Sequence, residues 1–192
     1  MSGDLGAKPD EVHEKASAVL HFWFDEVPPD KWYAKDEALD RMITERFGAV
    51  RDHVLFTMAA GWRDDPDNLL AAVILLDQFS RNIHRGTAAA FAADPLALKL
   101  TERAIILAWD DRLPVERRAF LYMPMMHAEN RATQAKSVAW FERLGNAENV
   151  KFAREHAEVI ERFGRFPSRN AALGRDSTPE ELDYLSQPDA GW

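Results

Sequence analysis

The run Leu69-Leu70-Ala71-Ala72-Val73-Ile74-Leu75-Leu76 is apolar at every position. Asp65-Pro66 just before it is typical of a helix start, because Asp caps the first turn and proline is tolerated at the first helical position. A helix that is apolar all round is covered by neighbours on every side. Eight apolar residues are far fewer than the roughly 20 that a membrane span needs. The run therefore predicts a central, buried helix in a soluble protein.

Elsewhere, apolar residues recur at the i, i+3, i+4 spacing of helices with one buried face. No segment alternates apolar and polar residues as a half-buried strand does. Asp94-Pro95 repeats the cap-and-proline signal, Gly145 and Gly164 are stop signals, and Thr178 begins a capping box. The expected helices span residues 11–24, 36–60, 66 through the apolar run, 94–109, 115–126, 129–144, 147–163 and 178–185. We predict an all-α fold of seven to eight helices, in antiparallel pairs that form a superhelix or a bundle.

Length and composition narrow the possible classes of protein. A chain of 192 residues can bury a core without disulfides, and we expect a flexible leader over residues 1–10 and one helical domain over residues 11–192. The absence of cysteine removes thiolate chemistry and fits a reducing cytoplasm. A net charge of −8 disfavours nucleic-acid binding. We therefore expect a cytoplasmic protein without a nucleic-acid or membrane partner; its oligomeric state is not defined by the sequence.

Two similar polar phrases interrupt apolar surroundings, Ser80-Arg81-Asn82 after the apolar run and Ser168-Arg169-Asn170 near the C-terminus. Arg and Asn are costly to desolvate, so their place beside hydrophobic segments indicates a built polar site. Asp77 and Arg81 stand four residues apart and are expected to pair. The two phrases are interpreted as two walls of one site. Its predicted binding residues are Asp77, Gln78, Arg81, Asn82, Arg85, Asn130, Arg165, Arg169 and Asn170.

One imidazole and one carboxylate, His127 and Glu129, lie together between two predicted helices. Such a pair can move a proton near neutral pH, which makes these two residues the candidate catalytic groups. His156 lies on the apolar face of its helix and is interpreted as a core residue. Two ligands are too few for a metal site, and the usual zinc-protease and phosphate-loop motifs are absent from the sequence. No metal or cofactor is predicted.

Several of these phrases together resemble the bacterial family catalogued as domain of unknown function 924. The resemblance is carried by residues 19–24 (VLHFWF), 32–36 (WYAKD), 76–82 (LDQFSRN), 125–130 (MMHAEN) and 162–175. It implies an all-helical fold similar to tetratricopeptide-repeat superhelices, and it implies no activity. The chain departs from the usual family wording at Ser168, where His is common, and at Ala128 and Asn130, where Ser and Asp are common. Both departures remove groups useful in catalysis and favour binding.

Three functions remain open from the sequence. The leading hypothesis is a binding protein for an anionic small molecule or a peptide carboxylate, on the premise that Arg81, Arg85, Arg165 and Arg169 face only Asp77 and Glu129. The first alternative is a hydrolase or lyase with His127 as general base, oriented by Glu129. The second is a purely structural cluster in which the two phrases fasten the C-terminal loop to the central helix.

Overall fold

The structure is a computed structural model that describes residues 9–188 and 190, and within these residues it is helical without a strand. At its centre α3 (Pro66–Ile74), the π-helical turn η3 (Leu75–Phe79) and α4 (Ser80–Ile83) follow one another without a break. Counted as one rod, they bring the described part of the chain to eight helices, which confirms the all-α prediction. The other helices are α1 (Pro9–His21), α2 (Glu37–Phe56), α5 (Asp94–Ile106), α6 (Val115–Met126), α7 (Arg131–Leu144), α8 (Ala147–Phe163) and α9 (Pro179–Leu185).

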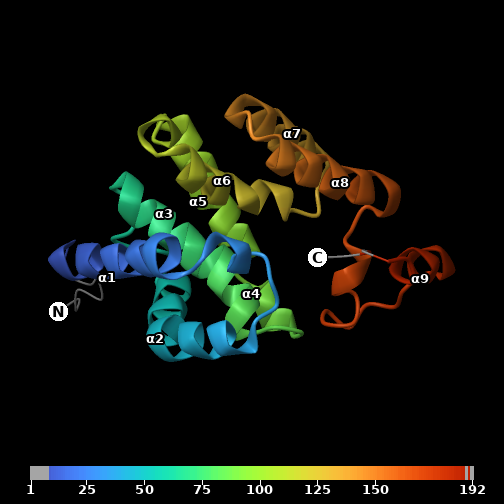
Figure 1. The fold of residues 1–192 in the computed structure, drawn as a ribbon, viewed down its shortest axis with the longest axis horizontal. Helices are drawn as coiled ribbons and strands as arrows, with labels where there is room; N and C mark the ends of the chain where they lie inside the picture. The colour runs from blue at the N-terminus through green and yellow to red at the C-terminus, as the bar shows by residue number, and fades with distance from the viewer. Residues whose placement is uncertain (1–8, 189, 191–192) are drawn as a thin grey trace, which may run out of the picture.

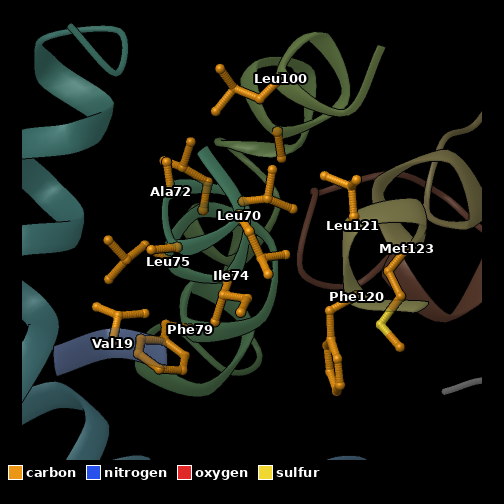
Figure 2. Packing of buried hydrophobic residues seen from close by; sticks show 14 of the residues in the cluster. Val19, Leu70, Ala72, Ile74, Leu75, Phe79, Leu100, Phe120, Leu121 and Met123 are labelled. Carbon is orange, nitrogen blue, oxygen red and sulfur yellow. The ribbon is translucent and has the colours of Figure 1, made fainter. Parts of the chain in front are cut away.

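The central rod is the core of the molecule. Every side chain from Leu69 to Leu76 is at most 1% exposed, because α1, α2, α5 and α6 all pack against the rod. Figure 2 shows Leu70, Ile74 and Leu75 on the rod, with Leu100 of α5 and Leu121 of α6 beside them. Burying side chains of this size stabilises the fold by about 1.5–3 kcal/mol each. The apolar run therefore has the central position that its sequence predicts.

Local start and stop signals set most of the helix boundaries. The Asp65 carboxylate accepts hydrogen bonds from the N–H groups of Asp67 and Asn68 and caps α3. Gly145 and Gly164 end α7 and α8 in the left-handed conformation, with φ of 82° and 71°. Thr178 forms the predicted capping box at the start of α9. These boundaries agree with the sequence prediction because each depends on residues within one helical turn.

Other predicted boundaries are wrong. Helix α2 ends at Phe56 rather than at residue 60, because Met58 and Ala59 turn into the left-handed region with φ of 52° and 58°. This turn buries Ala59 completely. Helix α5 ends at Ile106 rather than at residue 109, and α7 begins at Arg131 rather than at residue 129. The predicted leader 1–10 falls mostly outside the described residues, and its residues 9 and 10 belong to α1.

The C-terminal half is connected to the rod through α6, which packs against α3. Helices α6, α7 and α8 are consecutive neighbours joined by the short links 127–130 and 145–146, an arrangement consistent with stacked helix pairs. In Figure 1, α7 and α8 lie side by side, and α9 lies at the edge of the molecule, apart from the helices around the rod. Helix α9 packs instead on the 3-10 turn η6 (Pro167–Arg169). Among the described residues, no helix combines the length and the apolar character of a membrane span.

Candidate functional site

A carboxylate and an imidazole meet where the central rod passes the end of α6. Asp77 lies on the π-helical turn η3 and its side chain is 1% exposed. His127 follows the last residue of α6, and its Nδ1 lies 2.7 Å from Oδ1 of Asp77. The amide of Gln78 donates to the other oxygen of Asp77. Single π-helical turns inside helices often mark functional sites, and this one places Asp77 against His127.

The ionisation of this pair follows from its surroundings. Burial favours the neutral acid, but Arg81, His127 and Gln78 together outweigh burial and hold the pKa of Asp77 well below its usual range. Burial lowers the pKa of His127, and the opposing effect of Asp77 does not offset it. At neutral pH the pair is thus an ionised Asp77 and a neutral His127. A neutral imidazole beside a carboxylate donates a hydrogen bond to it, so Nδ1 carries the hydrogen and Nε2 has a free lone pair.

Because Nδ1 of His127 is bonded to Asp77, the reactive atom of this imidazole is Nε2. It makes no hydrogen bond to any residue in the described part of the chain, and the side chain is 16% exposed. The imidazole is therefore oriented by one nitrogen and open at the other. Such a group can accept a proton from a bound molecule or from water.

Arg81 and Arg169, one from each polar phrase, meet at Asp94. Arg81 donates two hydrogen bonds to the Asp94 carboxylate, at 3.0 and 2.9 Å, and a third at 2.8 Å to the backbone carbonyl of Asp77. Arg169 lies 3.3 Å from Oδ2 of the same carboxylate and donates at 2.9 Å to the backbone carbonyl of His127. The two phrases therefore lie together, as the sequence predicts, and one shared carboxylate joins them.

The guanidinium of Arg169 contacts two aromatic rings. Its Cζ is 4.6 Å from the ring centre of Phe91 and 4.5 Å from that of Phe166. Burial, together with the nearby cation of Arg81, lowers the pKa of Arg169 to about 10. Arg169 is thus still charged at neutral pH, but its cation is less well stabilised than a free one.

The other predicted binding residues lie away from this centre. Asn82 and Arg85 both donate to Asp40 of α2, while Arg165 and Asn170 both donate to Glu181 of α9. Asn130 caps α7 by accepting from the N–H of Thr133. Of the predicted residues, the structure brings together Asp77, Gln78, Arg81, His127 and Arg169.

Two sequence interpretations need correction. The premise of surplus arginines is wrong, because each of the four has a carboxylate partner. The pairs are Arg81 with Asp77 and Asp94, Arg85 with Asp40, Arg165 with Glu181, and Arg169 with Asp94. The orienting role given to Glu129 is also misplaced, since Asp77 holds His127. Glu129 instead accepts two hydrogen bonds from Arg175, at 2.7 and 2.9 Å, and one from the Phe166 N–H at 2.7 Å.

Asp94 is the site residue that sequence reasoning missed. Its place before a proline predicts a helix cap, but Ala93 occupies the N-cap position of α5 and no side chain caps that helix. The carboxylate of Asp94 instead accepts hydrogen bonds from Arg81 and Arg169. His156, interpreted as core, is 6% exposed, and its ring centre lies 6.0 Å from that of His127. Burial, and to a smaller extent His127, lowers the pKa of His156 to about 3, so it is neutral too.

Acid is expected to weaken the attachment of α9. Hydrogen bonds from Arg165 lower the pKa of Glu181 to about 2, below the value of about 4.3 for a free Glu. The folded protein thus binds this proton less tightly than the unfolded chain, so the stabilisation by Glu181 is present above about pH 4.3 and is lost as the pH falls through about 2. We expect the difference in Tm between wild type and Glu181→Gln to shrink between about pH 6 and about pH 2. A difference that is constant over this range contradicts the assignment.

Comparison with known proteins identifies a family whose function is unknown. The family model described as "Bacterial protein of unknown function (DUF924)" matches residues 19–189. A solved structure, the protein of unknown function ATU0120 from Agrobacterium tumefaciens, is 37% identical to this chain and superposes with a TM-score of 0.87. That match covers 92% of this chain and 99% of the other. No curated protein matches.

Proposed function

This chain belongs to the bacterial family of unknown function DUF924, and from its site we propose an enzyme of hydrolase or lyase type in which His127 is the general base. The observation that carries the proposal is the Nδ1 to Oδ1 distance of 2.7 Å between His127 and the ionised Asp77, with Nε2 left open. Asp77 orients the ring and stabilises the imidazolium that forms when Nε2 takes up a proton.

The rest of the site supports a base rather than an acid. Burial lowers the pKa of His127, which keeps Nε2 unprotonated at neutral pH. Arg169 donates a hydrogen bond to the backbone carbonyl of the same residue, so its cation lies close to His127. A positive charge in this place stabilises negative charge that develops on a substrate as its proton leaves or as water adds to it.

An anionic ligand at Arg169 is the second candidate, a narrower form of the binding function expected from the sequence. Arg169 has five N–H donors, and within the described residues it makes two hydrogen bonds, to Asp94 and to the carbonyl of His127. Burial and the cation of Arg81 lower the pKa of Arg169, so a further negative group would stabilise its charged form. A carboxylate of a small molecule or a peptide has this chemistry.

The cytoplasmic location remains a prediction of the sequence.

Turnover by variants at His127 tests the proposed enzyme. We expect the purified wild-type protein to act on some members of a panel of small substrates. It is expected to hydrolyse esters or amides, or to catalyse elimination from β-substituted acids. The esters and amides are tested with and without a further carboxylate group. His127→Gln is expected to lower kcat/KM by about 10²–10⁴-fold, because it removes the proton acceptor. His53→Gln, on the exposed side of α2, is the matched control and is expected to leave the rate unchanged.

The same panel separates the two candidates. The proposed enzyme is contradicted if His127→Gln retains the wild-type turnover. It is also contradicted if the wild-type protein turns over no compound of the panel. Compounds that raise Tm without being turned over, and that lose this effect in Arg169→Ala, support anion binding alone, because a ligand of the native state raises stability by mass action.

A further inference from the structure

The chain that follows α8 packs against the site through polar contacts. Residues 165–185, which we call the cover, comprise η6, a turn and α9, and they begin directly after Gly164. Gly164 has a φ of 71°, a conformation that glycine adopts without strain and that lets the chain change direction there. The cover therefore has a natural pivot immediately before its first residue.

Contacts within the cover make it a unit. Arg165 donates two hydrogen bonds to Glu181, at 2.7 and 2.8 Å, and Asn170 donates to the same carboxylate at 3.2 Å. These bonds tie the turn η6 to α9, which itself packs on η6. Near the pivot, Phe166 packs with Val159 and Ile160 of α8 in a small apolar cluster separate from the main core. The two parts of the cover, η6 and α9, are thus held together by hydrogen bonds, and the cover packs against the end of α8.

Polar contacts at three places hold the cover to the rest of the protein. One lies at the end of α8, where Arg162 donates to Glu180 at 2.9 Å. The other two lie near the site, and we call them the latch. At the first, Glu129 in the link between α6 and α7 accepts from the Phe166 N–H and from Arg175. At the second, Arg169 contacts Asp94 and the backbone carbonyl of His127. Glu129 and Arg175 are each 24% exposed, so water already reaches this contact. Partly exposed ion pairs are among the weaker contacts of a fold, in contrast to the buried rod.

We propose that residues 165–185 open about Gly164 as a hinged cover that controls access to His127, with the contacts of Glu129 and of Arg169 as its latch. In the closed form Arg169 and Phe166 lie beside His127 and His156. Opening breaks these polar contacts and also separates Arg169 from the Phe91 ring and Tyr184 from the Phe163 ring, while the apolar core around the rod stays intact. The purpose of the cover rests on the proposed function of His127, but its motion does not.

Hydrogen exchange of the wild-type protein, read by mass spectrometry, tests the motion. We expect the amides of α9 and η6 to exchange through a local opening, at least about tenfold faster than those of the central rod under the same conditions. Protection of residues 165–185 equal to that of residues 66–83 overturns the cover, because it shows that they unfold only together with the core.

Breaking the latch tests the control of access. In Glu129→Gln we expect exchange in residues 165–185 and the rate of His127 modification by diethylpyrocarbonate to rise at least about tenfold, with the exchange of the rod unchanged. Glu142→Gln is the matched control, because Glu142 also bridges two helices of this half, through a 2.7 Å contact with Arg154, yet lies outside the latch. Unchanged His127 modification in a folded Glu129→Gln protein overturns the latch. Neither readout uses turnover, so the cover and the enzyme can fail separately.

Discussion

Asp77→Asn is expected to lower the free energy of unfolding by about 3–5 kcal/mol, the cost of breaking a buried ion pair. Asp77 is fully buried, and its two carboxylate oxygens contact His127, Arg81 and Gln78. The amide has one oxygen in place of two and no charge, so one of these donors then faces another donor. For a chain of this length the change corresponds to a fall in Tm of roughly 6–20 °C in a thermal melt.

Asp64→Asn is the control for this prediction. Asp64 also pairs with an arginine, Arg103, but its side chain is 84% exposed. Exposed pairs of this kind contribute about 0–1 kcal/mol, so Tm is expected to change little. If Asp77→Asn is as mild as this control, Asp77 does not carry a buried charge in the folded protein, and the proposed state of His127 loses its basis.

The same variant has a chemical consequence. Asp77 raises the pKa of His127 against the effect of burial, so Asp77→Asn is expected to lower that pKa further and to release Nδ1 from its carboxylate acceptor. The ring would stay neutral, but it would lose the orientation that exposes Nε2. Stability and turnover are thus expected to fall together at Asp77, whereas His127→Gln removes the base while the Asp77 to Arg81 pair remains.

The helices could be predicted from the sequence because their signals are local. An Asp at the start of α3 or a glycine after α7 acts on backbone groups within one turn, so its effect does not depend on the rest of the fold. The burial of Leu69 to Leu76 could also be predicted from the sequence, since a helix without a polar side has no face to expose to water. The turn at Met58 and Ala59 was not, because nothing in these side chains favours a left-handed backbone.

The partners within the site are a different case. His127 has Glu129 two residues away in sequence, yet it pairs with Asp77, which is 50 residues away. Sequence proximity is misleading here because the link after α6 turns the two side chains to different neighbours. Glu129 reaches the cover at Phe166 and Arg175, while His127 reaches the rod. Which residues converge was partly predictable from the repeated polar phrases, but which carboxylate serves which cation depends on how the helices pack.

Asp94 gives the sharpest test of this difference between local and tertiary roles. If Asp94 were the helix cap that its sequence predicts, Asp94→Asn would cost little, because Asn caps about as well as Asp. In the structure it pairs with both Arg81 and Arg169, so we expect Asp94→Asn to lower the free energy of unfolding by about 3 kcal/mol or more. Denaturant unfolding of the purified variants measures this.

A double-mutant cycle with Arg169→Met then identifies the cause. When Asp94 is replaced, Arg169 becomes a half-buried cation next to Arg81 with no carboxylate between them, so removing its charge is expected to recover part of the lost stability. We therefore expect Arg169→Met to be less destabilising in the Asp94→Asn background than in wild type, by about 1–3 kcal/mol. Additive effects would mean that the two residues do not interact, and that the polar phrases meet without sharing a charge.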